Sequence, residues 1–166
     1  MIIKNIEFFF PKNKLTYKNL NKKFPKWKIN TTQKITGIEN LYFVDKNQTS
    51  LDLAIHAIKK IKNFKLLKKK IDGLIFCTQT PNRFIPSNSS ILHGILKLRE
   101  SCFTLDISHG CSGYVYGLTI AKKLLENNTC KNILLINSDT YSKIINPKDR
   151  MTKVIFSDAA SVTHLQ

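Results

Sequence analysis

The chain has 166 residues, 42% of them hydrophobic, and a formal net charge of +16. This composition is that of a globular domain with a substantial core, and it excludes a disordered chain. No apolar run is long enough to span a membrane, and the N-terminus lacks the apolar segment of a secretory signal, so we expect a cytoplasmic protein.

Strand-like and helical patterns alternate along the chain. Residues 2–10 predict a strand, and residues 11–40 predict a loop-rich segment with a short helix. Thr49 and Ser50 cap a helix whose apolar residues recur at helical spacing. The later segments are predicted strands at 71–77, 103–107, 132–137 and 161–165, and predicted helices at 88–98 and 112–125. The alternation favours one layered α/β domain, 1–166, with a largely parallel sheet.

The chain contains four cysteines: Cys77, Cys102, Cys111 and Cys130. None forms a C-x-x-C pair, and no Cys/His cluster has the spacing of a zinc site, so we expect no metal. Three of them lie in or near apolar stretches and are expected to be core or near-surface residues without a chemical role. Without a secretory signal, reduced thiols are favoured over disulfides.

Cys111 differs from the other three in its surroundings. A predicted strand runs into Ser108-His109-Gly110-Cys111-Ser112-Gly113, and a helical pattern follows at once. A thiol at a helix start meets unpaired backbone N–H groups and the positive end of the helix dipole, which favour the thiolate. The flanking glycines would leave room for a substrate carbonyl. This pattern predicts acyl transfer through a thioester on Cys111, although a buried structural thiol is the alternative.

Other titratable residues near this motif have simpler interpretations. His109 either forms an ion pair with Cys111 or, as we favour, lies in the loop without that role. Asp106, Asp139 and Asp158 each follow or end a predicted strand, where capping and turn hydrogen bonds are the common use of a carboxylate.

Lysine supplies most of the positive charge, and lysines cluster between residues 59 and 70. A biased composition spread over solvated surface explains most of this charge. An acidic partner, such as a carrier protein, is a second explanation. We expect no nucleic-acid partner, because the sequence has no zinc finger, basic zipper or RNA-binding signature.

Several motifs occur in an order and spacing that resemble the N-terminal half of β-ketoacyl-acyl-carrier-protein synthase III, a thiolase-fold condensing enzyme. The match begins near residue 30. The motifs are Thr36-Gly37-Ile38, Ile71–Phe76 with Thr78, Ile85-Pro86-Ser87, Asp106–Gly113 with Gly117-Leu118, Asn137-Ser138-Asp139, Pro147–Arg150 and Phe156–Ala160.

The resemblance implies one half of an αβαβα pseudo-dimer, with the C-terminal half absent. In that family, the cysteine that matches Cys111 takes an acyl group from acyl-coenzyme A or an acyl-carrier protein. A malonyl-carrier thioester then loses CO₂ and is condensed with that group. The implied pathway is fatty-acid biosynthesis or a specialised acyl route, such as one serving a surface polysaccharide. The resemblance implies no bound cofactor.

The resemblance also assigns binding roles. Arg150 would contact the coenzyme, and Trp27 is a weaker candidate for the same site. Phe84 and Ile85 would lie in the loop that crosses a twofold axis and lines the partner's acyl tunnel, which implies a homodimer. Acyl-carrier protein is the expected partner.

Two features set the chain apart from the family pattern. The family's decarboxylation His and Asn come from its C-terminal half, and none of this chain's histidines matches that catalytic His. Hence a non-catalytic remnant, or a half that pairs with a separate C-terminal half, is the alternative function. The second feature is a set of replacements that favours a divergent member: Ile35 for arginine, and Met151, Ser157, Ala159 and Ser161 for glycines.

Overall fold

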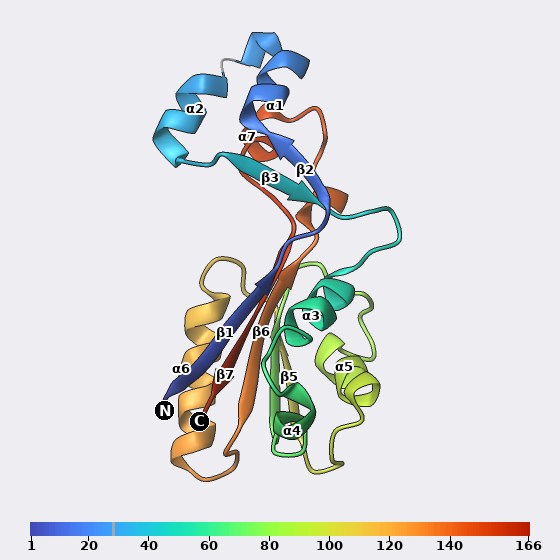
Figure 1. The fold of residues 1–166 in the computed structure, drawn as a ribbon, viewed down its shortest axis with the longest axis vertical. Helices are drawn as coiled ribbons and strands as arrows, with labels where there is room; N and C mark the ends of the chain where they lie inside the picture. The colour runs from blue at the N-terminus through green and yellow to red at the C-terminus, as the bar shows by residue number, and fades with distance from the viewer. Residues whose placement is uncertain (28) are drawn as a thin grey trace.

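The structure, a computed structural model, describes residues 1–27 and 29–166. Five strands form the main sheet in the order β1–β7–β6–β4–β5, and two others form a small antiparallel sheet (Figure 1). The strands are β1 (Ile3–Phe9), β2 (Asn13–Thr16), β3 (Asn40–Phe43), β4 (Gly73–Cys77), β5 (Phe103–Ile107), β6 (Ile133–Asp139) and β7 (Ala159–Leu165). The helices are α1 (Tyr17–Lys23), α2 (Ile29–Thr36), α3 (Ser50–Ile58), α4 (Phe64–Lys68), α5 (Asn88–Leu96), α6 (Gly113–Glu126) and α7 (Arg150–Lys153), with 3₁₀ turns η1 (Pro25–Trp27) and η2 (Tyr141–Lys143).

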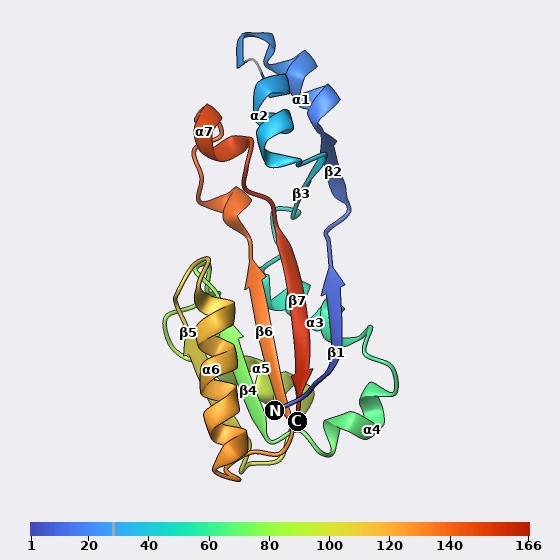
Figure 2. The ribbon, with the colours of Figure 1, turned by 90° about the vertical axis from the view of Figure 1, so that its left-hand side faces the viewer.

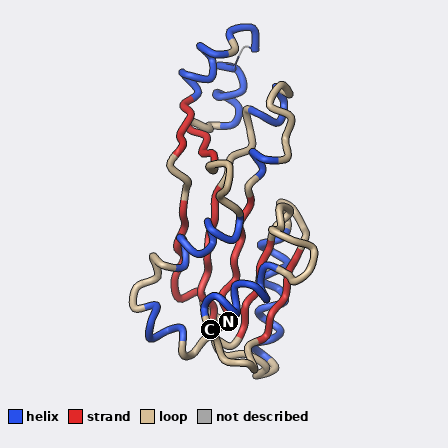
Figure 3. The backbone as a smooth tube through the Cα atoms, turned by 90° about the vertical axis from the view of Figure 1, so that its right-hand side faces the viewer, coloured by secondary structure: helices blue, strands red, loops and turns tan. Residues whose placement is uncertain are grey.

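The sheet is largely parallel, as the alternating pattern predicted. Strand β4 pairs in parallel with β5 and β6, whereas β7 is antiparallel to both β6 and β1. Four strands therefore share one direction and only β7 opposes them, as the strand arrows in Figure 2 show. Figure 3 traces the same strands in red along the long axis of the molecule. Cys77 is in register with Ile107 and with Asn137, so the carboxyl ends of three neighbouring strands meet at one edge.

Helices cover both faces of the sheet unequally. Helices α3 and α5 pack on one face, where Phe76, Ile136 and Val162 contribute to the larger core. Helix α6 packs on the other face over β4 and β6. On this second face β1 and β7 have no helix in front of them (Figure 2). As a result, Phe8 and neighbouring apolar side chains of β1 are exposed.

Local signals account for the helix starts. The Thr49 hydroxyl accepts from the backbone N–H of Asp52, and the Asp52 carboxylate accepts from the N–H of Thr49, which completes a capping box. The Ser87 hydroxyl caps α5 in the same way by accepting from the N–H of Ser90. Within the described residues, no helix is long and apolar enough to cross a membrane.

The prediction for residues 11–40 was wrong in its loop content. This segment contains β2, α1, η1 and α2, which pack with β3 and α7 into a small lobe (Figure 1). Its core includes Tyr17, Leu20, Leu41 and Val154, and the Tyr17 hydroxyl donates to the Val154 carbonyl. Because these short elements depend on contacts with a segment more than 100 residues away, the local pattern did not reveal them.

Candidate active site

Cys111 lies in the turn between β5 and α6, one residue before the helix N-cap, Ser112. Its side chain is exposed. The turn is closed by a hydrogen bond from the N–H of Gly113 to the carbonyl of Gly110, with an N···O distance of 3.0 Å. The thiol therefore has the position beside a helix start that the sequence predicted.

The glycines of α6 serve packing rather than substrate access. A Cβ added to Gly113 would lie 2.0 Å from the Cys77 sulfur, and one added to Gly117 would lie 2.5 Å from Cδ1 of Leu135. The helix therefore lies closer to β4 and β6 than any larger residue would permit. This corrects the expectation that Gly113 leaves room for a carbonyl. A Cβ added to Gly110 would lie 3.1 Å from Oε1 of the Gln79 side-chain amide.

Asp139 joins the ends of two strands beside Cys111. Its Oδ1 accepts from the N–H groups of Gln79 and Thr80, at 2.8 and 3.1 Å, and from the hydroxyls of Thr78 and Thr80, both at 3.0 Å. This carboxylate has the turn-bonding role that the sequence favoured. It holds the segment after β4 against the end of β6.

Tyr141 and Gln79 are site residues that sequence reasoning missed. The Tyr141 hydroxyl donates to Oε1 of Gln79, and its ring stacks on Phe156 with centroids 4.7 Å apart. Burial, followed by the nearby Asp139 and Cys111 charges, raises the pKa of Tyr141. Both residues follow strands whose carboxyl ends meet at one edge of the sheet. That shared edge was the signal from which sequence reasoning could have predicted that they lie together.

The other two aspartates are structural as well. Asp106 accepts from the N–H groups of Asn88 and Ser89, both at 2.8 Å, and so caps α5 from the end of β5. Asp158 is fully buried and accepts from the N–H groups of Val44 and Ser142, both at 2.8 Å. These carboxylates fix backbone segments at the edge of the sheet where β5 ends and β7 begins.

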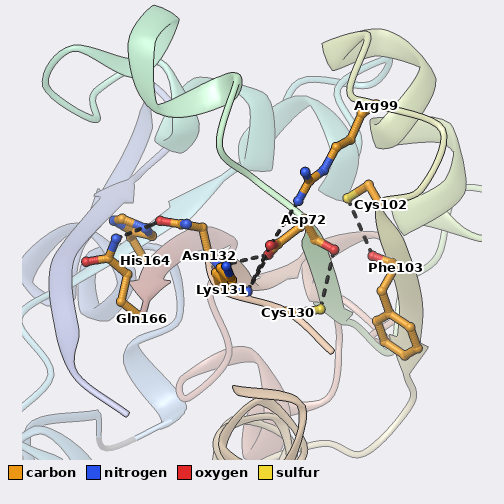
Figure 4. Close-up of polar contacts among 9 residues, drawn as sticks. All are labelled: Asp72, Arg99, Cys102, Phe103, Cys130, Lys131, Asn132, His164 and Gln166. Carbon is orange, nitrogen blue, oxygen red and sulfur yellow. Dashed lines mark hydrogen bonds and ion pairs between the residues drawn. The ribbon is translucent and has the colours of Figure 1, made fainter. Parts of the chain in front are cut away.

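The remaining cysteines are buried, so of the core and near-surface positions that the sequence left open, the structure shows the core position. Burial is the main cause that raises the pKa of Cys77 and of Cys130, and it raises the pKa of Cys102 to about 11. Cys102 and Cys130 lie at the amino ends of the strands near Asp72 (Figure 4). Cys111 is therefore the one exposed thiol. In the described part of the chain, no group of three His, Cys, Asp or Glu residues could hold a metal ion.

His109 points to a neighbour other than the thiol. Its ring lies against the Tyr116 ring, with centroids 4.3 Å apart, and both residues are exposed. No hydrogen bond joins His109 to Cys111 among the residues that the structure describes. This arrangement fits the loop histidine that the sequence favoured.

Arg150 and Trp27 come together although they are 123 residues apart. The Arg150 guanidinium donates to the Trp27 carbonyl at 3.4 Å, and the Trp27 ring stacks on Phe24 at 4.0 Å. The Asp149 carboxylate caps α7, and its bonds to the Thr152 hydroxyl and the Met151 N–H lower its pKa. The two predicted coenzyme residues thus share one surface of the small lobe.

Phe84 and Ile85 project from the loop between β4 and α5. They are 99% and 87% exposed, so almost none of their apolar surface is covered within this chain. The base of the loop is fixed, because the N–H of Asn82 donates to the Asn88 amide and Ser50 donates to the Thr80 carbonyl. A loop with a hydrogen-bonded base and an apolar tip is suited to contact another molecule.

A cavity of about 430 Å³ lies at the carboxyl end of β1, next to Tyr141. Phe8 and Phe10 form its apolar side, and Asn137, Asp139 and Ser157 contribute polar groups. Oδ1 of Asn137 is buried and has no hydrogen-bond partner within residues 1–27 and 29–166. Ser157 is one of the residues that depart from the family pattern. Its hydroxyl accepts from the N–H of Tyr42 and donates to the Tyr42 carbonyl.

Comparisons with known proteins agree with this arrangement. Residues 105–166, which include Cys111, match the family of 3-oxoacyl-[acyl-carrier-protein (ACP)] synthase III. The chain is 36% identical over 135 residues to a putative 3-oxoacyl-[acyl-carrier-protein] synthase 3 of Campylobacter jejuni. It is 41% identical over 127 residues to the β-ketoacyl-[acyl-carrier-protein] synthase III of Caldanaerobacter subterraneus. These matches cover 81% and 75% of the chain but only 38% of each relative.

Solved structures give the same result for the fold. A crystal structure of 3-oxoacyl-(acyl-carrier-protein) synthase III superposes with a TM-score of 0.91 at 34% identity, covering 98% of this chain and 48% of that one. The synthase from Burkholderia xenovorans superposes with a TM-score of 0.89 at 31% identity, covering 98% of this chain and 47% of that one. Sequence and structure together assign this chain to the 3-oxoacyl-[acyl-carrier-protein] synthase III family, with a match to about half of its thiolase fold.

Proposed function

We propose that this chain carries an acyl group as a thioester on Cys111 in a reaction of the synthase III type. The observation that supports this most strongly is the exposure of one thiol at a helix start, while the other three thiols are buried. The family match includes this residue and the helix behind it. A helix start favours a thiolate, the nucleophilic form of cysteine.

In the proposed first step, the Cys111 sulfur attacks the thioester carbonyl of an acyl-coenzyme A or an acyl-carrier protein. The new carbon–sulfur bond forms as the donor's thiol leaves. The backbone N–H of Cys111 would donate to the oxyanion, and one such donor is commonly worth about 3 kcal/mol. In the second step, a malonyl-carrier thioester loses CO₂ and its enolate attacks the acyl carbon, which releases the Cys111 thiolate.

The surrounding residues have roles consistent with this chemistry. Arg150 offers a planar set of donors suited to a phosphate of the donor, and Trp27 lies beside it. Phe84 and Ile85 would line the acyl site of a second copy in a homodimer, since their own chain leaves them uncovered. The pathway would be fatty-acid biosynthesis in the cytoplasm or a specialised acyl route. The donors for decarboxylation would come from the rest of the thiolase fold.

The test is the intact mass of the protein after incubation with acyl-coenzyme A and, separately, with an acyl-carrier protein. We expect one acyl adduct on the wild type and none on Cys111→Ser. The matched control is Cys130→Ser, which keeps a donor for the Asp72 carbonyl and should be acylated like the wild type. An equal adduct on Cys111→Ser would contradict the proposal.

A second function is favoured by a separate observation. On the face that α6 covers only partly, several apolar side chains are exposed: Ile6, Phe8, Phe10, Val115 and Tyr116. An apolar face of this kind drives association. The second proposed function is therefore that of a half that pairs with a second polypeptide through this face. The chain spans about two-fifths of the length of the curated relatives it matches.

Sedimentation of the 166-residue chain tests this second function. We expect oligomers for the wild type and dissociation for the double variant Phe8→Ser/Val115→Ser. A matched control is Ile95→Ser, which alters an exposed apolar residue on α5. A monomeric wild type would count against an unpartnered half.

A further inference from the structure

The segment from Lys59 to Lys70 carries an unusual density of positive charge. It contains seven lysines in 12 residues and no acidic residue. Spread evenly, the 24 lysines of the chain would place about two in such a segment. Biased composition therefore does not explain this cluster, which we call the α4 surface because α4 lies at its centre.

The α4 surface is free of internal charge partners. Six of its seven lysines are exposed. Lys60 is held over Phe8 and donates to its carbonyl at 2.9 Å. Among the described residues, the ion pairs involve Arg99, Lys122 and Lys123 and none of these seven lysines. The surface thus presents uncompensated charge to an external partner.

Apolar surface lies among these lysines. Leu66 is 66% exposed at the middle of α4. It borders two cavities: one of about 440 Å³ lined also by Phe64 and Lys65, and one of about 320 Å³ lined also by Lys4 and Lys70. An exposed leucine inside a ring of lysines combines an electrostatic and an apolar contact in one small area.

The composition of the α4 surface favours one class of partner. Specific protein interfaces are enriched in arginine, tyrosine and tryptophan and depleted in lysine, and this segment contains lysine alone of these residues. Proteins usually bind single-stranded nucleic acid by stacking its bases on exposed aromatic rings. The one aromatic residue of this segment, Phe64, is partly buried against the core. An anionic bilayer requires only net charge and a residue that can enter the interface.

From these observations we infer that the α4 surface binds a membrane rich in anionic phospholipid, with Leu66 entering the headgroup region. Helix α4 precedes the amino end of β4, whereas Cys111 follows the carboxyl end of β5. The two sites lie at opposite ends of the sheet, separated by the length of β4, about 16 Å for five residues. A protein bound through α4 would leave Cys111 open to donors from solution.

The experiment measures binding of the 166-residue chain to vesicles of equimolar phosphatidylglycerol and phosphatidylcholine, and to vesicles of phosphatidylcholine alone. We expect binding only to the anionic vesicles, and weaker binding as salt rises. The triple variant Lys62→Glu/Lys65→Glu/Lys69→Glu should bind at least about 100-fold more weakly, because each lysine near an anionic surface contributes about fivefold. Leu66→Ser should weaken binding about tenfold and leave the salt dependence unchanged.

The control is Lys18→Glu/Lys22→Glu/Lys26→Glu, which makes the same change in net charge at exposed positions of the small lobe. It should weaken binding far less than the α4 triple variant. Equal losses for the two triple variants would overturn the inference, because net charge alone would then explain binding. Tighter binding to duplex DNA or polyglutamate than to anionic vesicles would also overturn it and would assign the surface to nucleic acid or to an acidic protein.

Discussion

The two ends of the main sheet use the same chemical groups for different purposes. At the amino ends, Asp72 accepts from the N–H groups of Lys131 and Asn132 and from Arg99, and Cys130 lies against its carbonyl (Figure 4). At the carboxyl ends, Asp139 gathers four donors beside Cys111. Each end therefore has a carboxylate that fixes loops and a nearby thiol. Exposure of the thiol distinguishes the candidate nucleophile from the structural cysteines.

The largest expected effect is on stability and concerns Asp72, at the amino ends of the strands. Asp72→Ala should lower the free energy of unfolding by about 3 kcal/mol, because it leaves buried N–H groups without an acceptor. Arg99→Ala removes the other partner, whose side chain is 49% exposed, and should cost less than about 1 kcal/mol. Urea titrations of both variants provide the measurement. Equal losses would mean that the ion pair, and not the backbone bonds, carries the stability of this end.

The reactivity of the four thiols sharpens the comparison directly. In the native protein, iodoacetamide should modify Cys111 at least about 100-fold faster than the other three cysteines, because those react only after local opening of the core. Peptide mapping over time gives the four rates. In urea the rates should become similar. Native labelling of Cys77 at the rate of Cys111 would show that burial does not separate them.

Packing of α6 against the sheet gives an intermediate effect. Gly117→Ala should destabilise the protein by about 1–3 kcal/mol, because the added Cβ would lie 2.5 Å from Leu135. The matched control is Gly94→Ala on α5, where a Cβ meets nothing within 4 Å and should stabilise by about 0.5 kcal/mol. Thermal unfolding of both variants tests this. A stabilised Gly117→Ala protein would refute the close approach of α6.

The smallest effect is a pH dependence from the buried thiols. Burial raises the pKa of Cys102 to about 11 from an ordinary value of 9.0, so the folded state keeps the proton after the unfolded state has lost it. The free energy of unfolding should therefore fall as pH rises between 9 and about 11. Cys102→Ala should make this decline shallower in urea titrations at several pH values. An unchanged slope would mean that Cys102 does not contribute.

The sequence predicted the features that depend on local pattern. The strands predicted at 71–77 and 103–107, the cap at Thr49 and the helix after Cys111 all appear close to their expected bounds. The pairing of Tyr141 with Gln79 depends on strand register, and the contact of Arg150 with Trp27 depends on a lobe assembled from distant segments. Neither kind of information is present in a local pattern. The packing role of Gly113 could not be predicted for the same reason, because its neighbour is the Cys77 sulfur of strand β4.

The most direct test of the central claim is the location of the acyl group after incubation with acyl-coenzyme A or an acyl-carrier protein. Digestion and mass spectrometry should find it on the peptide that contains Cys111, and neutral hydroxylamine should release it, as expected of a thioester. Acylation at Cys77, Cys102 or Cys130 instead, or an adduct that resists hydroxylamine, would contradict the assignment of Cys111 as the acyl carrier.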